Sequence, residues 1–171
     1  MILSLVKEPD PILRRTAKDV REISGEIHRL IADMIETMHA AEGVGLAANQ
    51  VGSPWNILVA SADGAPGKEL VLLNASILRQ SGQIPGPEGC LSLPGISSSV
   101  TRSSEVVVEG LDRKGKLRTL EATGLLARIF QHETDHLQGR LYIDRLPLWE
   151  RRRLLTKYRS LREAPDRFRV E

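Results

Sequence analysis

The stretch Thr123–Gly139 reads TGLLARIFQHETDHLQG and predicts the helix around which this chain folds. Threonine is a suitable N-cap at its start, and glycine is common just beyond the C-terminal end of a helix. Within it, His132 and His136 are one helical turn apart, so both imidazoles can reach a single metal ion. Glu133 lies about 60° farther round the helix from His136, where its carboxylate can face the same space without binding the metal. The sequence therefore predicts two nitrogen ligands and a neighbouring carboxylate.

The apolar residues that precede this motif predict the direction in which the two histidines point. Leu125, Leu126 and Ile129 form an apolar helix face, so we expect the pair to be buried. Unpaired buried imidazoles are costly, and a metal ion would satisfy them. The alternative is a polar helix surface that carries two exposed histidines.

A metal site needs at least a third ligand, and Cys90 is a candidate. It is the only cysteine, and it stands in the segment 87–95, PEGCLSLPG. One thiolate and two imidazoles suit Zn(II) or Fe(II) and leave a coordination position for water. The alternative is a buried, unreactive thiol. Asp135 points away from His136 and is better placed as a salt-bridge partner.

Length and composition indicate one ordinary globular domain. Of the 171 residues, 41% are apolar and 27% are charged, which excludes a wholly disordered chain. No apolar run approaches the ~18 residues of a membrane-spanning helix, and the N-terminus lacks a secretory pattern. A single cysteine excludes an internal disulfide.

The periodicity of the remaining chain predicts an α+β fold, with antiparallel strands packed around the helix that carries H-E-x-x-H. Residues 81–104 are rich in Gly, Pro and Ser, and we expect them to be largely loop or short strand. The other expected elements are an N-terminal helix over 25–41, strands over 56–61 and 69–74, a hairpin of 105–111 with 116–120, and a C-terminal helix from Pro147 to about Glu163. We expect residues 1–146 to form a single catalytic domain and residues 147–171 to pack on it or extend from it.

Charge is unevenly distributed along the chain. Residues 145–171 carry nine basic and four acidic side chains, although the net charge of the whole chain is only +2. A basic segment of this kind indicates an anionic partner. The alternative is a helix face that is simply solvated.

A third segment, Gly43–Gly52, reads GVGLAANQVG and lacks the Lys-Ser/Thr ending of a phosphate loop. Together with Glu88–Ser92, EGCLS, and Gln131–His136, QHETDH, it resembles the three motifs of the peptide deformylases, in the same order. The resemblance extends over about residues 1–150. It implies an α+β fold and an enzyme that removes the N-formyl group from the initiator formyl-methionine of nascent peptides and releases formate.

The resemblance also implies a ligand set and a location. Cys90, His132 and His136 would hold one divalent metal ion, natively Fe(II), with Zn(II), Ni(II) or Co(II) as substitutes. Such an enzyme would work in N-terminal processing in the bacterial cytoplasm or in an organelle. We expect a monomer that makes no membrane contact, with a possible ribosome or rRNA contact through basic residues 145–169.

Roles for the remaining site residues follow from the same resemblance. Glu133 would accept a proton from water and later deliver one to the leaving amine. The side-chain amide of Gln50 and the backbone N–H of Leu91 would stabilise the oxyanion. We expect Arg102 to pair with Glu88 or Asp135. The expected substrate-binding residues are Val44, Gly45, Gly89, Leu125 and Ile129.

Two other functions fit parts of the sequence. A zinc peptidase of the H-E-x-x-H type usually takes its third ligand from downstream, but no histidine follows His136. A catalytically inactive, metal-stabilised ribosome- or RNA-binding module would use only the basic C-terminal segment. The sequence departs from the common family pattern at Pro87, Asn49, Ala75 and 97–99, which bears on substrate affinity and side-chain preference rather than on the reaction.

Overall fold

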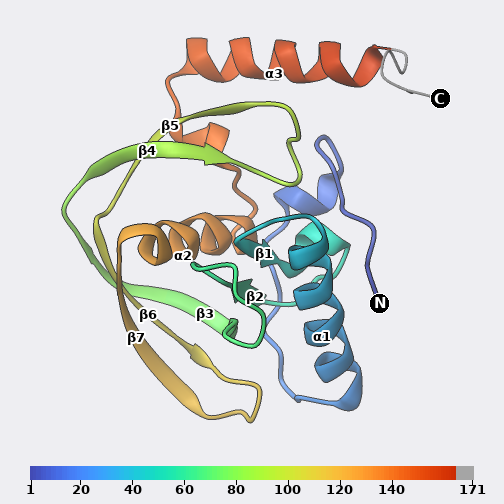
Figure 1. Ribbon diagram of the computed structural model, residues 1–171, viewed down its shortest axis with the longest axis vertical. Helices are drawn as coiled ribbons and strands as arrows, with labels where there is room; N and C mark the ends of the chain where they lie inside the picture. The colour runs from blue at the N-terminus through green and yellow to red at the C-terminus, as the bar shows by residue number, and fades with distance from the viewer. Residues whose placement is uncertain (165–171) are drawn as a thin grey trace.

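The computed structural model describes residues 1–164 and has the predicted α+β architecture (Figure 1). Three α-helices and seven strands are present in this part of the chain. The helices are α1 Gly25–Ala40, α2 Gly124–Leu137 and α3 Leu148–Glu163. The strands are β1 Gly45–Ala47, β2 Ile57–Ala60, β3 Leu70–Ser81, β4 Ile84–Gly89, β5 Ser97–Arg102, β6 Glu105–Leu111 and β7 Leu117–Thr123. Short 3-10 helices lie at Pro11–Arg14, Ala48–Val51 and Tyr142–Arg145.

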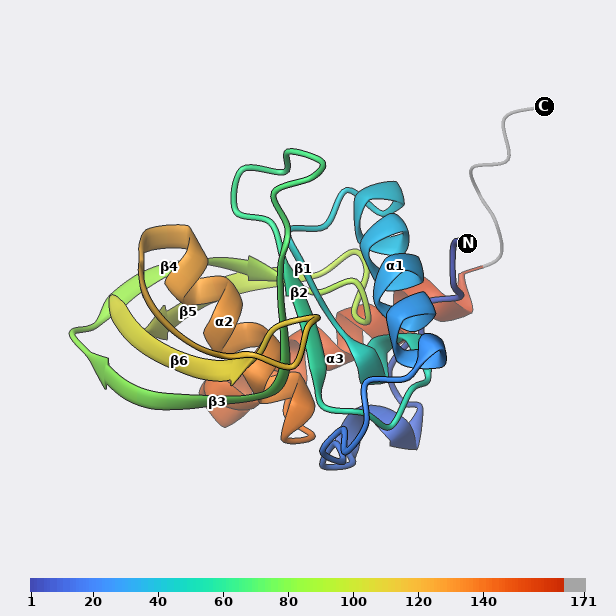
Figure 2. The same cartoon turned by 90° about the horizontal axis from the view of Figure 1, so that it is seen from below.

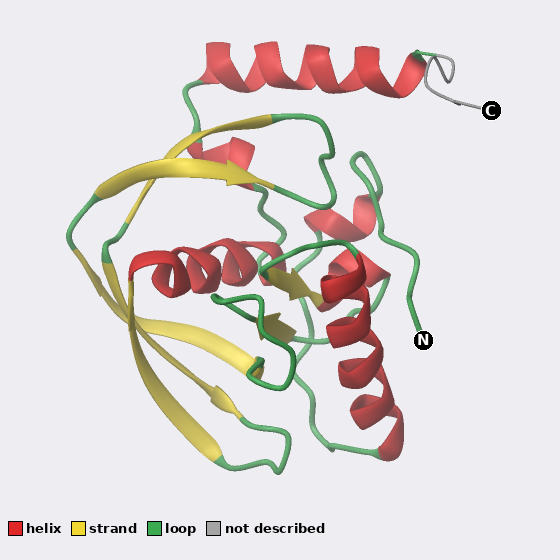
Figure 3. Cartoon of the chain, viewed as in Figure 1, coloured by secondary structure: helices red, strands yellow, loops and turns green. Residues whose placement is uncertain are grey.

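Helix α2 lies between the two antiparallel sheets (Figures 1 and 3). The five-stranded sheet has the order β1-β2-β3-β6-β7, and β4 pairs only with β5. Phe130 and Ile129 of α2 are buried in one cluster with Leu58, Leu72 and Val108 of the larger sheet. Phe130 lies about 200° round α2 from His132, so its burial against the larger sheet directs the motif histidines toward the β4–β5 hairpin.

Local signals account for α1 and for the ends of α2. The Ser24 side chain accepts a hydrogen bond from the Ile27 N–H at the start of α1, which then covers β1 and β2 (Figure 2). Helix α2 begins directly after Thr123, as predicted, although the Thr123 side chain makes no capping hydrogen bond, and Gly139 follows the helix end with φ of +74°. Both helices therefore agree with their predicted bounds within a residue or two.

Strand β1 is not among the expected strands, and strand β3 is longer than expected. Strand β3 continues to Ser81, past the predicted end at Asn74, where φ is +55° and the register with β6 shifts. The segment 81–104, expected to be largely loop or short strand, holds the six-residue strands β4 and β5, in agreement with the second expectation. Pro85 and Pro87 make β4 difficult to recognise from the sequence, because proline is normally depleted in strands. They are tolerated here because a two-stranded sheet has free edges.

Helix α3 packs over the β4–β5 hairpin through fewer residues than its sequence pattern predicts. Leu154 and Tyr158 are buried in a cluster with Val100 of β5. The spacing of apolar residues in this helix also predicts that Leu148 and Leu161 belong to the buried stripe, but they are 59% and 49% exposed, so that prediction is wrong. Arg167 and Arg169 lie outside the described residues. No helix within residues 1–164 has the length and apolar character needed to cross a bilayer.

Candidate metal centre

Three potential ligands converge where β4 ends beside α2. The Cys90 Sγ lies 3.2 Å from the His136 Nε2, and the two Nε2 atoms of His132 and His136 are also 3.2 Å apart. All three donor atoms lie within 4.8 Å of one another. The structure thus brings together the cysteine and both histidines that the sequence singled out.

The spacing of these atoms fits a divalent cation. Tetrahedral coordination with metal–sulfur bonds of ~2.3 Å and metal–nitrogen bonds of ~2.0–2.1 Å places the donor atoms roughly 3.3–3.6 Å apart. His136 is fully buried, and its burial lowers the pKa, which keeps the ring in the neutral form that binds metals. Burial would also lower the pKa of His132, but hydrogen bonding to Cys90 and Glu88 raises it well above its usual range.

Glu88 orients the ring of His132, whereas the His136 Nδ1 is buried without a hydrogen-bond partner among the described residues. The Nδ1 of His132 lies 2.8 Å from the Glu88 Oε1. Burial would raise the pKa of Glu88, but hydrogen bonds from Arg102 and His132 outweigh this effect and lower it to about 2. Since an ionised carboxylate only accepts hydrogen bonds, the His132 Nδ1 donates and leaves Nε2 for the metal. The backbone carbonyl of His136 accepts a hydrogen bond of 2.6 Å from the Asn49 Nδ2.

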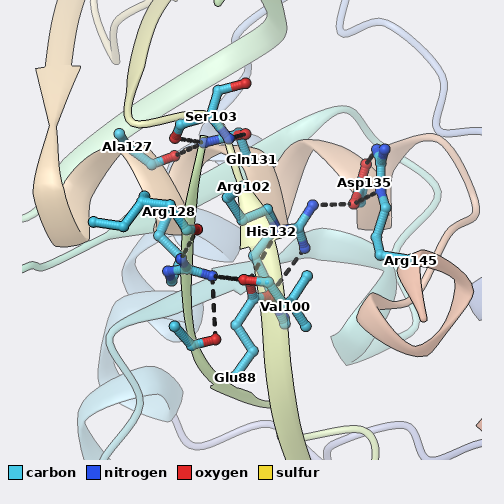
Figure 4. A network of polar contacts seen from close by, with 12 residues as sticks. Glu88, Val100, Arg102, Ser103, Ala127, Arg128, Gln131, His132, Asp135 and Arg145 are labelled. Carbon is cyan, nitrogen blue, oxygen red and sulfur yellow. Dashed lines mark hydrogen bonds and ion pairs between the residues drawn. The ribbon is translucent and has the colours of Figure 1, made fainter. Parts of the chain in front are cut away.

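Arg102 of β5 connects strand β4 and helix α2 through their carboxylates Glu88 and Asp135 (Figure 4). Its Nε and NH2 donate to Glu88 over 2.9 Å each, and its NH1 donates to Asp135 over 2.6 Å. Asp135 also accepts two hydrogen bonds from Arg145. The sequence predicted that Arg102 would pair with Glu88 or Asp135, and the structure has both pairs.

Glu133 faces the cavity from α2 and depends on a glycine for its space. A Cβ atom on Gly45 would lie 2.5 Å from the Glu133 Oε1 and 2.8 Å from the Ile129 side chain. The Oε2 is buried and has no hydrogen-bond partner among the described residues. Burial raises the pKa of Glu133 to about 7. A carboxyl group with that pKa can both accept and release a proton near neutral pH.

Two hydrogen-bond donors border the same space. The Gln50 Oε1 accepts from the Ala47 N–H, which turns its Nε2 toward the Ser92 Oγ at 3.2 Å and the Cys90 Sγ at 3.5 Å. The Leu91 N–H has no acceptor within the described residues. An amide side chain and a free backbone N–H at one place suit a developing oxyanion.

A cavity of about 400 Å³ opens beside these groups. Glu133 and Cys90 line its polar end, whereas Val44 and Leu125 are 40% and 50% exposed at its margin. All the predicted substrate-binding residues line this cavity, namely Val44, Gly45, Gly89, Leu125 and Ile129.

Comparison with known proteins identifies this arrangement. The sequence profile of the polypeptide deformylase family matches residues 2–152. The chain belongs to the peptide deformylase family. It is therefore a metal-dependent hydrolase that removes the N-formyl group from formyl-methionyl peptides, which confirms the prediction made from the three motifs. Nothing in these comparisons supports the peptidase or the non-catalytic RNA-binding module.

Individual deformylases resemble this chain over nearly its whole length. A peptide deformylase of Thermodesulfovibrio yellowstonii is 44% identical over 163 residues, 93% of this chain and 98% of the relative. The crystal structure of a peptide deformylase from Legionella pneumophila has a TM-score of 0.89 at 38% identity and covers 96% of this chain and 100% of its own. The deformylase of Ehrlichia chaffeensis in complex with actinonin has a TM-score of 0.87 at 35% identity, covering 95% and 99%.

Several residues of this deformylase site were not found from the sequence. Arg128 contacts Glu88, and the Lys7 Nζ donates to the Leu91 carbonyl over 3.0 Å. Asn49 was noted only as a departure from the family pattern, yet it holds the backbone of His136. A lone arginine, lysine or asparagine carries no pattern that marks it as part of a site.

The other departures from the family pattern lie in different places. Pro87 lines the cavity. The Ser98 hydroxyl donates to Glu150 of α3, and Ala75 lies in β3, where its N–H donates to Asn56. Of these three positions, Pro87 is the one placed to contact a substrate.

Proposed function

We propose that Cys90, His132 and His136 bind one divalent metal ion and that Glu133 transfers protons during hydrolysis of the formyl amide. The observation that supports this assignment is the 3.2 Å spacing of the ligand atoms beside a buried, unpartnered carboxylate oxygen. A divalent cation supplies a Lewis acid and lowers the pKa of water so that hydroxide exists near neutral pH.

In this proposal, Glu133 takes the proton of the attacking water and returns one to the nitrogen of the scissile amide. The Gln50 Nε2 and the Leu91 N–H donate hydrogen bonds to the oxygen of the formyl group as negative charge develops there. Both donors are already in position before the substrate binds. The Ala47 N–H fixes the Gln50 side chain, and the Leu93 N–H, which donates to the Cys90 carbonyl, fixes the turn that contains Leu91. These donors need little reorganisation during the reaction.

The peptide would lie between two backbone edges of the cavity. Gly45 is the first residue of β1, at the edge of the large sheet, and Gly89 is the last residue of β4. Edge backbone groups can add an extended peptide by main-chain hydrogen bonds. Val44, Leu125 and Ile129 would then surround the methionine side chain.

Replacement of Glu133 tests this assignment most directly. Glu133→Ala should lose nearly all formate release from a formyl-methionyl dipeptide while it retains the metal. Cys90→Ser should instead lose metal affinity. If Glu133→Ala remained active, or if Cys90→Ser bound the metal as tightly as the parent, the assignment would be wrong.

We further propose that Fe(II) is the native metal and that the enzyme works in the bacterial cytoplasm or in an organelle. A thiolate with two imidazoles also accepts Zn(II), Ni(II) and Co(II), so the donor set does not select one metal. Cys90 is partly exposed at the cavity, where an Fe(II) centre would be sensitive to oxidation. Anaerobic purification followed by metal analysis tests the proposed metal, and an enzyme isolated anaerobically with zinc alone would contradict it.

We also propose that the exposed basic face of α3 contacts ribosomal RNA and that the enzyme works as a monomer. Arg152, Arg153 and Arg159 are exposed, whereas Leu154 and Tyr158 of the same helix are buried in the core. Removal of α3 would therefore expose core residues as well as remove charge.

Charge reversal is thus the cleaner experiment. Arg152→Glu with Arg153→Glu should weaken co-sedimentation with ribosomes at low salt, and the parent's binding should fall as salt rises. Reversal of the exposed pair Arg113 and Lys114 in the β6–β7 turn serves as the matched control. Equal loss in both variants would argue against a specific role of α3.

A further inference from the structure

Arg128 lies one helical turn before His132 on α2 and reaches the β4–β5 hairpin with its guanidinium (Figure 4). Its NH1 donates to the Glu88 Oε2 over 2.7 Å and to the Val100 carbonyl over 2.8 Å. Its NH2 donates to the Ile84 carbonyl over 2.9 Å. One side chain of the central helix thereby contacts the backbone of both strands of the hairpin and the carboxylate that orients His132.

The hairpin is built to receive this guanidinium. A Cβ atom on Gly86 would lie 2.8 Å from the Arg128 NH2, so only glycine leaves the space that the arginine occupies. The Arg128 side chain is 12% exposed and forms an ion pair with Glu88, whose side chain is 4% exposed. A lysine could not reproduce these contacts, because its ammonium is a single point donor rather than a planar fork.

A tether of this kind is needed because β4 and β5 pair only with each other. An isolated two-stranded hairpin is marginally stable, so its position over α2 depends on side-chain contacts. Two residues of β4 have to be held closely: Glu88 must stay 2.8 Å from the His132 Nδ1, and Gly89 forms part of the cavity edge.

We propose that Arg128 is a positioning residue that holds the β4–β5 hairpin on α2 and so maintains the contact of Glu88 with His132. The proposal rests on the proposed role of His132 as a metal ligand. Arg128 acts through Glu88 and the hairpin backbone, and it takes no part in proton transfer.

Co(II)-loaded variants test this proposal with a readout separate from activity. Arg128→Met should lower the Co(II) affinity about 10–100-fold in competition with a chelator, the usual effect of losing a contact that orients a metal ligand. It should also change the Co(II) absorption spectrum. Arg118→Met is the matched control, since Arg118 is an exposed arginine on β7 of the other sheet, and the Co(II) affinity of this variant should equal that of the parent.

A double-mutant cycle with Gly86 distinguishes positioning from a general loss of stability. Gly86→Ala should also lower the Co(II) affinity, because its methyl group displaces the guanidinium. In the Arg128→Met background that methyl group meets no guanidinium, so the double variant should be no weaker than Arg128→Met alone. If Arg128→Met does not fold, Arg128→Lys replaces it in the same cycle and should lose a measurable part of the affinity.

An unchanged Co(II) affinity and spectrum in the Arg128 variant would overturn the proposal, and so would additive losses in the double variant. His132→Ala separates this failure from that of the proposed function. If His132→Ala bound Co(II) as tightly as the parent, the ligand assignment itself would be wrong, whatever the Arg128 variants show.

Discussion

The Tyr158 hydroxyl of α3 donates a hydrogen bond of 2.9 Å to the backbone carbonyl of Glu8, near the other end of the chain. Arg162 donates to the same carbonyl. The Glu8 N–H in turn donates to the Ser92 carbonyl over 3.0 Å, two residues after Cys90. Helix α3 is therefore connected to the cysteine-containing turn through the N-terminal segment.

Tyr158→Phe should lower the free energy of unfolding by about 0.5–1.5 kcal/mol, because the partly buried hydrogen bond from the Tyr158 hydroxyl to the Glu8 carbonyl is lost. The carbonyl still accepts a hydrogen bond from Arg162. Tyr158→Ala should lower the free energy of unfolding by about 3–5 kcal/mol, because a ring that is 2% exposed is removed from the core. Urea unfolding measures both values. Trp149→Phe, at a 67% exposed position of the same helix, should leave stability unchanged. Equal effects at positions 149 and 158 would contradict the packing of α3.

Gly45→Ala should reduce kcat/KM by about 100-fold or more, since its methyl group would force the Glu133 carboxylate to move and small misplacements at a reacting centre have large effects. Metal content should stay at the parent value. Formate release and metal analysis on one preparation check both points. Gly25→Ala is the control because a Cβ atom there meets nothing within 4 Å. Full activity of Gly45→Ala would show that the Glu133 position is not critical.

Gln50→Glu should lower kcat by about 100–1,000-fold with a smaller change in KM, because a carboxylate of nearly the same size cannot donate to the developing oxyanion. Steady-state formate release at several substrate concentrations separates the two constants. A change confined to KM would instead indicate that Gln50 only binds the peptide.

The contact between His39 of α1 and Glu69, at 2.6 Å, should make stability depend on pH. Burial would raise the pKa of Glu69, but hydrogen bonds from His39 and the Gly67 N–H hold it below the usual 4.5. The contribution to stability is therefore present above pH 4.5 and is lost as the pH falls through the lowered pKa. The unfolding free energies of the parent and Glu69→Gln should differ most above pH 4.5 and converge as the pH falls below 4.5. A difference that stayed constant as the pH fell would contradict the prediction.

Much of the fold could be predicted from local patterns. Ser24 and the repeat of Ile27 and Ile31 mark α1, and Thr123 and Gly139 mark α2. The β6–β7 hairpin follows from two strand-like segments that flank a turn ending at Gly115, where φ is +78°. Each of these signals acts between residues a few positions apart, so it can be recognised without knowledge of the rest of the chain.

The candidate site could be predicted only in part. His132, Glu133 and His136 lie on one helix, so their common direction follows from helical geometry alone. The chemistry of its thiol makes Cys90 a candidate third ligand, but only the resemblance to a family places it, together with Gln50 and the cavity residues, beside the histidines. The structure then assembles all of these residues around one cavity.

The sequence by itself determined a helix with two histidines and a carboxylate on one face, because cap residues and apolar periodicity act locally. Only the tertiary structure decided that Arg128 would hold β4 and β5, that Gly45 would make room for Glu133, and that Tyr158 would contact Glu8. These contacts join residues 28 to 150 positions apart or depend on the absence of a single methyl group. They exist only after the sheets and helices have packed, since packing brings such distant groups within bonding distance.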